Sequence, residues 1–291
     1  MENYVIKKDN GISYLQFIKL LEYEEIVKHA ISLKPIDIGS NDRVTDEILS
    51  DQICTGAHCM CPKQQPIIED YKKLCNALKL DYKNIYRPYQ THTDIVKCIE
   101  NEEAGIFTKD FKDVDAIVTN KKNKILSISI ADCIDIIFFD PVKKVIANTH
   151  SGWQGTYKLI SKKTVENMVD NYECNPKDII CCIGPSIRKC HFEVDEELSL
   201  KFYEKFKYLR NINEIISEGS KENNKQKYNI DTVLINKETM LRMGLKEDNI
   251  IDCGLCTVCN SDKFHSYRVD KEKSGRNTGI ICMCNTNAYN E

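Results

Sequence analysis

A cysteine and a histidine near the middle of the chain lie on either side of a predicted β-hairpin and could share one metal ion. Two apolar runs flank Asp140-Pro141-Val142-Lys143, in which Asp and Pro are favoured at the first two positions of a turn. With the turn centred between Pro141 and Val142, the numbers of paired residues add up to 283, and Cys133 faces His150. Directly opposed residues have Cβ atoms about 4.5–5.5 Å apart, close enough for a thiolate and an imidazole to bind one ion.

Other interpretations of these two residues stay open. A free cysteine is often a small buried hydrophobe, and a slip of the hairpin by one residue would separate Cys133 from His150. Asp132 alternates with Cys133 and would point to the opposite face of a regular strand. Asp132, Asp115 and Glu193 therefore receive no firm catalytic role.

The loop that follows His150 resembles a binding loop in composition. The stretch Ser151-Gly152-Trp153-Gln154-Gly155-Thr156 carries two glycines and the only tryptophan of the chain. It leads into a predicted helix, whose first backbone N–H groups would suit an anion such as phosphate. Ordinary turn geometry for the glycines and core packing for Trp153 are the alternatives.

The elements that must position these residues alternate between strands and helices. Residues 4–33 are expected to form one or two strands and a short helix, and residues 211–228 a polar surface segment. Apolar patterns predict further strands over 93–99, 115–119, 125–130, 134–139, 144–149 and 179–183, and helices over 66–79, 157–170, 196–208 and 230–243, the last ended by Gly244. The chain is therefore expected to be a mixed α and β protein, with its densest sheet between residues 92 and 184.

Composition excludes several classes of protein. The 291 residues are 42% hydrophobic and 29% charged, with a formal net charge of -3, which suits neither a disordered chain nor a nucleic-acid binder. No run of about 18 apolar residues predicts a membrane span, and the first residues lack an export signal. We expect a cytoplasmic protein with no obligate protein partner, whose fifteen cysteines are thiols. No linker or repeat divides the sequence, so residues 1–291 are expected to form one domain.

Several motifs, taken in order, resemble one known family, the bacterial laccase-domain proteins. These proteins are also called multicopper polyphenol oxidases and are described as purine nucleoside phosphorylases. The resemblance covers residues 90–282 and is carried by Gln90-Thr91-His92, Asp115-Ala116-Ile117-Val118-Thr119, Ala131-Asp132-Cys133, His150-Ser151-Gly152-Trp153-Gln154-Gly155-Thr156, Gly184-Pro185-Ser186-Ile187 with Cys190, Glu193 and Val194, Cys256-Thr257, Phe264-His265-Ser266-Tyr267-Arg268 and Gly275-Arg276.

The resemblance implies a fold, a metal centre and an activity. The fold would be α+β, with mixed sheets sandwiched together and flanked by helices, as in the laccase-domain and cytotoxic-necrotizing-factor-like fold. The family's metal ligands correspond to His92, Cys133 and His150, which would bind zinc, with copper as the alternative, and leave a fourth position open for catalysis. The implied activity is phosphorolysis of adenosine, inosine and methylthioadenosine, together with deamination of adenosine.

Substrate-binding residues follow from the same comparison, with some departures. Arg268, Arg276 and the backbone amides after His150 are candidate phosphate ligands, and Trp153 is a candidate substrate contact. The chain has Gln154 where the family usually has Arg, His265 where it has Phe or Tyr, and Lys34 where Arg is expected. Gln and Lys cannot reproduce the bidentate fork of a guanidinium, so these departures bear on phosphate and ribose binding.

Three other functions are alternatives to the purine reaction. Copper-dependent oxidation of phenols would need more histidines than the six present. A hydrolase with Cys133 as nucleophile and His150 as base is chemically reasonable. A structural metal or iron–sulfur protein could use Cys253, Cys256 and Cys259 with Cys282 and Cys284, or the group Cys54, His58, Cys59 and Cys61.

Overall fold

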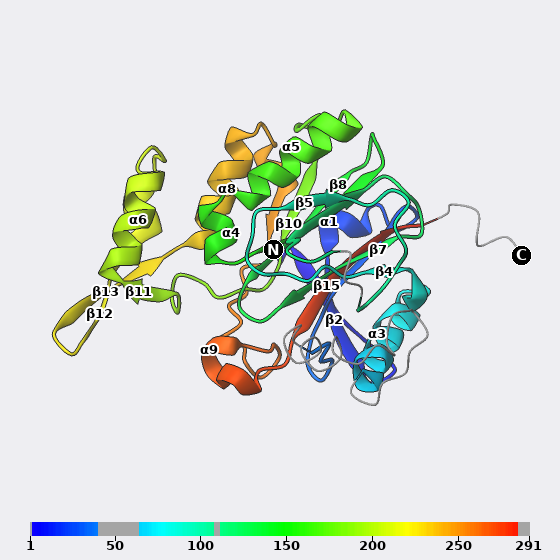
Figure 1. Cartoon of the computed structure of the whole chain (residues 1–291), viewed down its shortest axis with the longest axis horizontal. Helices are drawn as coiled ribbons and strands as arrows, with labels where there is room; N and C mark the ends of the chain where they lie inside the picture. The colour runs from blue at the N-terminus through cyan, green and yellow to red at the C-terminus, as the bar shows by residue number, and fades with distance from the viewer. Residues whose placement is uncertain (1, 40–63, 108–110, 285–291) are drawn as a thin grey trace, which may run out of the picture.

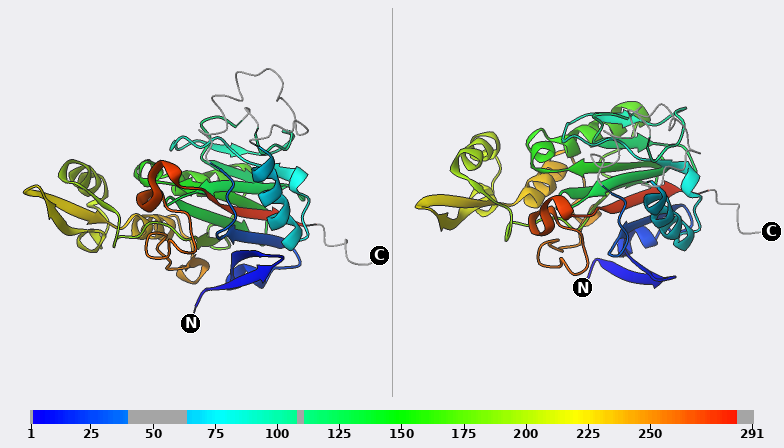
Figure 2. Two further views of the ribbon diagram at one scale, coloured as in Figure 1. Left: turned by 90° about the horizontal axis from the view of Figure 1, so that it is seen from below. Right: turned by 60° about the horizontal axis from the view of Figure 1, so that its bottom comes forward.

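Two six-stranded β-sheets packed face to face form the centre of the molecule (Figures 1 and 2). The computed structural model describes residues 2–39, 64–107 and 111–284. Strands from both ends of the described chain lie in the first sheet, where all neighbours are antiparallel except β7 and β4. Its order is β1 (Tyr4–Asp9), β2 (Ile12–Phe17), β3 (Val27–Ser32), β15 (Asn277–Met283), β7 (Ile125–Ile130) and β4 (Ile85–Tyr86).

The second sheet contains the strands on which the sequence analysis depends. It is antiparallel in the middle and parallel at both edges. Its order is β14 (Ile250–Asp252), β10 (Ile180–Ile183), β8 (Ile134–Asp140), β9 (Val145–Ser151), β6 (Ala116–Thr119) and β5 (Val96–Cys98). Every residue of β8 and β9 is buried, because both faces of this sheet are covered.

The main core lies between the two sheets. Ile31, Ile128 and Ile281 of the first sheet share one cluster with Ile137 and Phe139 of the second. Within this core, the side-chain amide of Asn148 in β9 donates hydrogen bonds to the carbonyl oxygens of Leu126 and Gly279 in the first sheet. Side-chain packing and buried polar contacts therefore both connect the sheets.

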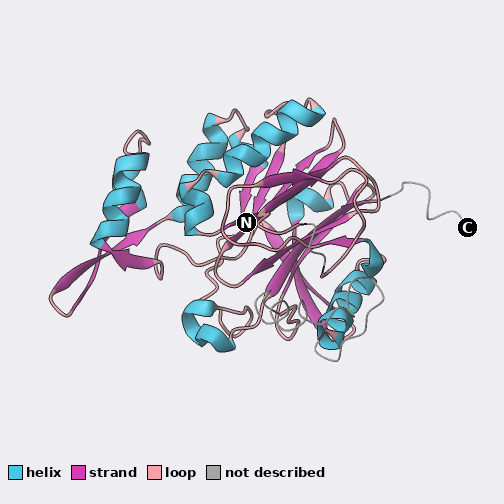
Figure 3. Ribbon diagram, in the orientation of Figure 1, coloured by secondary structure: helices cyan, strands magenta, loops and turns pink. Residues whose placement is uncertain are grey.

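Helices cover the outer face of each sheet, which confirms the expected α+β sandwich (Figure 3). Helix α3 (Gln65–Ala77) packs on the first sheet, whereas α5 (Ile160–Tyr172) and α8 (Thr232–Arg242) pack on the second. The remaining helices are short: α1 (Ile18–Leu21), α4 (Trp153–Tyr157), α7 (Ile212–Ile215), α9 (Tyr267–Asp270) and the 3-10 turns η1 (Tyr82–Asn84), η2 (Glu247–Asn249) and η3 (Lys271–Lys273). Among the described residues, none of the helices is long and apolar enough to cross a membrane.

A small unit extends to one side of the sandwich (left in Figure 1). It consists of α6 (Glu196–Phe206) and a three-stranded sheet in the order β11 (Glu193–Asp195), β13 (Lys225–Ile230) and β12 (Ile216–Glu222). The segment expected to be a polar surface excursion, residues 211–228, forms α7 and most of the hairpin made by β12 and β13. Its strand β12 is mostly exposed, which explains the missing apolar pattern.

The hairpin of β8 and β9 exists, but its expected register is wrong by two residues. Asp140 pairs with Val145 and Asp135 pairs with His150, so paired numbers add up to 285. The loop is longer than expected because Asp140 Oδ1 accepts hydrogen bonds from the N–H groups of Val142 and Lys143, and Lys144 adopts a left-handed conformation with φ of 57°. Cys133 precedes β8 and lies near Gly152 rather than opposite His150.

Candidate metal centre

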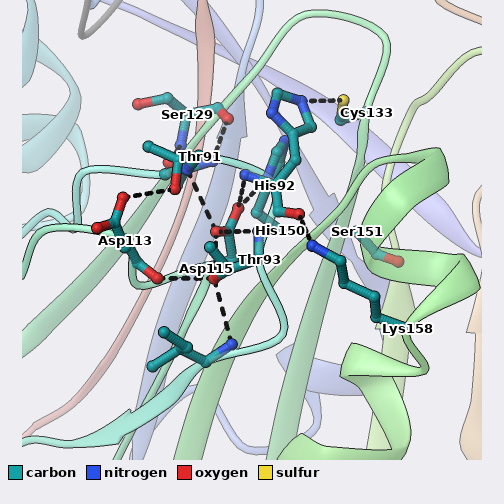
Figure 4. Close-up of polar contacts among 12 residues, drawn as sticks. Thr91, His92, Thr93, Asp113, Asp115, Ser129, Cys133, His150, Ser151 and Lys158 are labelled. Carbon is teal, nitrogen blue, oxygen red and sulfur yellow. Dashed lines mark hydrogen bonds and ion pairs between the residues drawn. The ribbon is translucent and has the colours of Figure 1, made fainter.

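Despite the shifted register, the side chains of His92, Cys133 and His150 converge at the end of the hairpin (Figure 4). One ligand atom from each residue lies within 4.8 Å of the other two. Cys133 Sγ is 3.7 Å from His92 Nε2, and the two imidazole ring centroids are 5.0 Å apart. With Zn–S about 2.3 Å and Zn–N about 2.0 Å, a tetrahedral ion separates its sulfur and nitrogen ligands by about 3.5 Å. The observed spacing fits such an ion.

The three ligands come from elements of different rigidity. His150 lies near the end of β9, and Cys133 immediately precedes β8, so the sheet fixes both. His92 lies in the loop between β4 and β5 and has a φ of 62°, in the left-handed region that few residues other than glycine adopt. The loop conformation at His92 therefore needs support from its surroundings.

Asp115, directly before β6, supplies that support and joins the two histidines. Its Oδ1 accepts a hydrogen bond from His150 Nδ1 at 2.7 Å and one from the His92 N–H at 3.1 Å. Its Oδ2 accepts hydrogen bonds from the N–H groups of Thr91 and Thr93 and from the Thr93 hydroxyl. Because His150 Nδ1 is held by the carboxylate, its Nε2 is directed at the site.

Burial alone would raise the pKa of the Asp115 carboxyl, but the hydrogen bonds from His150 and Thr93 outweigh it and hold the pKa below its usual value. Asp115 is therefore ionised at neutral pH. Two further contacts fix the His92 loop: Lys158 Nζ donates to the His92 carbonyl oxygen, and the side-chain amide of Gln90 pairs with both backbone groups of Ser129 in β7.

The thiol and the imidazole of this site favour opposite charges. Burial alone would raise the pKa of Cys133, but the charge of His150 and hydrogen bonds from both histidines lower it to about 6. For His150, burial lowers the pKa, while the Cys133 thiolate and Asp115 raise it to about 10. The protein alone thus stabilises a thiolate beside an imidazolium, and a cation that replaced the imidazolium proton would meet a ready sulfur ligand.

Gly152 leaves space between two of the ligands. A Cβ atom built on Gly152 would lie 2.9 Å from both Cys133 Sγ and His92 Cδ2, closer than real Cβ atoms approach such atoms. Its φ of -71° is open to any residue, so the need for glycine here comes from the close approach of the ligands. One thiolate and two imidazoles suit zinc or copper, and three protein ligands leave a coordination position for a reactant.

Of the three candidate substrate residues, Trp153 adjoins the metal centre in sequence, whereas the two arginines lie in later segments of the chain. Trp153 begins α4, next to Gly152, and is 39% exposed. The Arg268 N–H donates to Asp132 Oδ2 and its Nη1 donates to the His191 carbonyl oxygen. Arg276 Nη1 donates to the carbonyl oxygens of Ser274 and Gly275, and its charge acts on Tyr267, the neighbour of Arg268.

Asp132 holds a loop rather than occupying a strand. It has a φ of 82°, and its Oδ1 accepts a hydrogen bond from the Thr257 hydroxyl at 2.6 Å. Together with the bond from Arg268, this ties the residue before Cys133 to the segment that carries Thr257. Glu193 lies in β11, where it accepts a hydrogen bond from the Ser220 N–H.

Within the described residues, the structure does not bring together all of the cysteines that their spacing in the sequence grouped as a second metal site. Cys253 lies 3.6 Å from Arg188 Nη2, and Cys282 and Cys284 lie at the end of β15. Cys256 and Cys259 instead meet Cys190 and His191. The group Cys54, His58, Cys59 and Cys61 lies outside the described residues.

The sandwich of two mixed sheets with a histidine–cysteine–histidine cluster at the end of its central hairpin defines the class of protein. The sequence profile of the family described as "Multi-copper polyphenol oxidoreductase laccase" matches residues 53–284, and the chain belongs to this family. Curated relatives carry the name purine nucleoside phosphorylase, so the chain is an enzyme of a family with that named activity.

Two relatives illustrate the similarity in sequence. Purine nucleoside phosphorylase YlmD of Bacillus subtilis is 28% identical over 237 residues, which cover 80% of this chain and 82% of the relative. A purine nucleoside phosphorylase of Clostridium acetobutylicum is 31% identical over 196 residues, or 66% of this chain and 74% of the relative.

Two crystal structures share the fold. YfiH of Bacillus licheniformis matches with a TM-score of 0.76 at 23% identity, covering 95% of this chain and 98% of that one. YlmD of Geobacillus stearothermophilus matches with a TM-score of 0.77 at 18% identity, covering 98% and 100%. The expected family fold is thus confirmed.

Proposed function

We propose that the chain, acting as one domain over residues 1–291, is a metal-dependent purine nucleoside phosphorylase with His92, Cys133 and His150 as its metal ligands. Its substrates would be phosphate with adenosine, inosine or methylthioadenosine, and it would also deaminate adenosine. The observation that carries the proposal is the convergence of one thiolate and two imidazoles, in a family whose named relatives are purine nucleoside phosphorylases. Zinc fits this ligand set, and copper is the second candidate.

Phosphorolysis forms a bond between a phosphate oxygen and the anomeric carbon of ribose, while the glycosidic bond breaks and its electron pair leaves with the base. A zinc ion held by the three ligands would supply Lewis-acid polarisation of an oxygen on the reactants. Asp115 would hold the His150 imidazole and the His92 backbone during this step, because its carboxylate accepts a hydrogen bond from each. The reaction would therefore depend on Asp115 as a positioning residue, because both of its carboxylate oxygens accept hydrogen bonds from the residues around the metal site.

The remaining candidates would bind the two ends of the substrates. Trp153 presents an exposed ring next to Gly152, and a purine could stack on it, an interaction worth about 1–3 kcal/mol for nucleobases on aromatic side chains. Arg268 and Arg276 would bind phosphate, and the buried cation of Arg87 lies close enough to Arg276 for the two charges to interact. Lys34 Nζ donates a hydrogen bond to the Ser261 carbonyl oxygen, so Lys34 would hold the loop that contains Ser261 and would not contact the substrate directly.

The decisive experiment incubates metal-replete protein with adenosine and resolves adenine, inosine and ribose 1-phosphate by chromatography. We expect adenine and ribose 1-phosphate only when phosphate is present, and inosine with or without phosphate. The Cys133→Ala variant, with the sulfur ligand removed, should form none of the three. Adenine formed at the same rate without phosphate would contradict phosphorolysis.

The same preparation separates the alternatives. A thiol hydrolase that uses the Cys133 and His150 pair would keep its activity after chelation, whereas the proposed enzyme loses it and recovers it when zinc is restored. A phenol oxidase would consume oxygen with a phenolic substrate once copper is supplied. Activity that survives complete chelation would refute metal dependence. Whether the substrate is a nucleoside would then be decided by the products that chromatography resolves.

A further inference from the structure

Four potential ligands converge in a second cluster, separate from the proposed catalytic centre. Cys190 and His191 come from the segment between β10 and β11, and Cys256 and Cys259 come from the segment after β14. Their ligand atoms all lie within 4.8 Å of one another. No ligand of this group belongs to the His92, Cys133 and His150 centre.

We propose that these four residues form a second metal site, a closed structural zinc site with three thiolates and one imidazole. The distances match tetrahedral coordination: His191 Nδ1 lies 3.2 Å from Cys190 Sγ, 3.6 Å from Cys256 Sγ and 3.5 Å from Cys259 Sγ. Cys190 Sγ and Cys259 Sγ are 3.9 Å apart. A tetrahedral zinc ion would give about 3.5 Å between sulfur and nitrogen and about 3.8 Å between two sulfurs.

The backbone around Cys256 is arranged to stabilise a thiolate. The N–H groups of Val258, Cys259 and Arg188 all direct hydrogen bonds at the Cys256 sulfur. Cys256 and Cys259 are separated by two residues, the spacing at which a tight turn presents two thiolates to one ion. Cys190 and Cys259 are exposed whereas Cys256 is buried, so an ion could enter from solvent.

The two segments are already joined by backbone contacts at this place. Ser186 and Cys256 form an isolated parallel bridge, and the Thr257 N–H donates to the Ser186 carbonyl oxygen. The Thr257 hydroxyl donates a hydrogen bond to the Asp132 carboxylate. Arg268 donates hydrogen bonds to the same carboxylate and to the His191 carbonyl oxygen. An ion on the four ligands would lock these loops, which hold the residue before Cys133.

The site has no open position, since four protein ligands complete a tetrahedron. It would therefore stabilise the fold and hold Asp132 in place, without binding substrate. The ion would be distinguishable from the catalytic one because it has three sulfur ligands instead of one.

The test measures bound zinc per chain after loading with zinc and gel filtration under reducing conditions. We expect two ions in the unmodified protein, one in Cys259→Ser and one in Cys133→Ala. Cys253→Ala is the matched control, because Cys253 belongs to the same run of cysteines and faces Arg188 instead of the cluster; it should keep two ions. A single ion in the unmodified protein that Cys259→Ser leaves in place would refute the second site.

Cobalt provides a measurement that does not need a variant of the cluster to fold. In Cys133→Ala loaded with cobalt(II), the proposed catalytic centre has no sulfur ligand, so within residues 2–39, 64–107 and 111–284 the second site is the remaining cluster that can give strong thiolate-to-cobalt absorption. We expect such absorption, with the visible bands of tetrahedral cobalt. Its absence would overturn the proposal, and so would peptide mass spectrometry that finds Cys190 and Cys259 joined by a disulfide in the zinc-supplied protein.

Discussion

Replacing Gly152 with alanine tests whether the three ligands share one ion. The new Cβ atom would lie 2.9 Å from Cys133 Sγ and from His92 Cδ2. Non-bonded heavy atoms settle at about 3.5–4.0 Å, so each contact must open by roughly 0.6–1 Å. Metal–ligand distances tolerate only about 0.2 Å. The variant should therefore lose coordination by Cys133 or His92.

The expected loss of zinc affinity exceeds about 100-fold, the upper end of what removal of a residue supporting a metal ligand costs. Phosphorolysis should fall with it. The backbone of Gly152 has a φ of -71°, which alanine adopts without strain, so circular dichroism should show an intact fold. Zinc content and a competition titration with a coloured chelator would measure the effect.

Gly155→Ala is the control, because it changes the same loop three residues away. There the added Cβ would meet Ile160 Cγ2 at 3.2 Å, a flexible side-chain end that can move by the few tenths of an ångström required. We expect zinc binding to stay within a few-fold of the unmodified protein. If Gly152→Ala binds zinc as tightly as Gly155→Ala, the inferred convergence of ligands on one ion is wrong.

Four further changes test other parts of the site. Asp115→Asn should weaken zinc binding by about 10–100-fold, measured by chelator competition, because one amide N–H₂ must face donor groups. Trp153→Ala should raise the KM for adenosine by about 5–150-fold if the purine stacks on it, and quenching of the single tryptophan's fluorescence by adenosine reports the contact directly. In metal-free protein, alkylation of Cys133, followed by peptide mass spectrometry, should be half-maximal near pH 6, slow below it as the thiolate is protonated, and stop when zinc binds. Burial raises the pKa of Asp135 to about 8, so between about pH 4 and pH 8 the metal-free native state holds a proton that the unfolded chain has released. The free energy of unfolding, measured in urea, should therefore fall as the pH rises through this range. The fall should be steeper than in Asp135→Asn by up to about 1.4 kcal/mol per pH unit.

Local sequence patterns predicted the elements with regular apolar spacing. Strand β7 has the predicted bounds, and helix α3 lies within about two residues of its predicted range. The exposed strand β12 was missed because none of its residues is buried. Periodicity reports burial, so a strand held by backbone hydrogen bonds to β13 alone leaves no such signal.

Contacts between distant segments set the limit of what the sequence could predict about the sites. Asp115 had no assigned role, because nothing in its neighbourhood in sequence indicates that it reaches His150, 35 residues away. The second cluster shows the same limit: spacing grouped Cys253 with Cys256 and Cys259, whereas the structure brings in His191, which is 65 residues from Cys256. Spacing along the chain identifies ligands only where one turn supplies them.

The candidate ligands Cys133 and His150 were predicted from a hairpin register that is itself wrong, yet the structure brings them together, and the reason is geometric. Side chains on a strand alternate with a period of two residues, so a register shifted by two keeps every side chain on its expected face, whereas a shift of one reverses all of them. Asp140 and the left-handed Lys144 lengthen the loop, which moves Asp135 opposite His150 and places Cys133 beyond the end of the strand. From there its sulfur reaches the site diagonally, beside Gly152. A bulky residue at position 152 would occupy that diagonal. The shifted register follows from two additional loop residues, Lys143 and Lys144, and Cys133 still meets His150 because a shift of two residues preserves the face of each side chain.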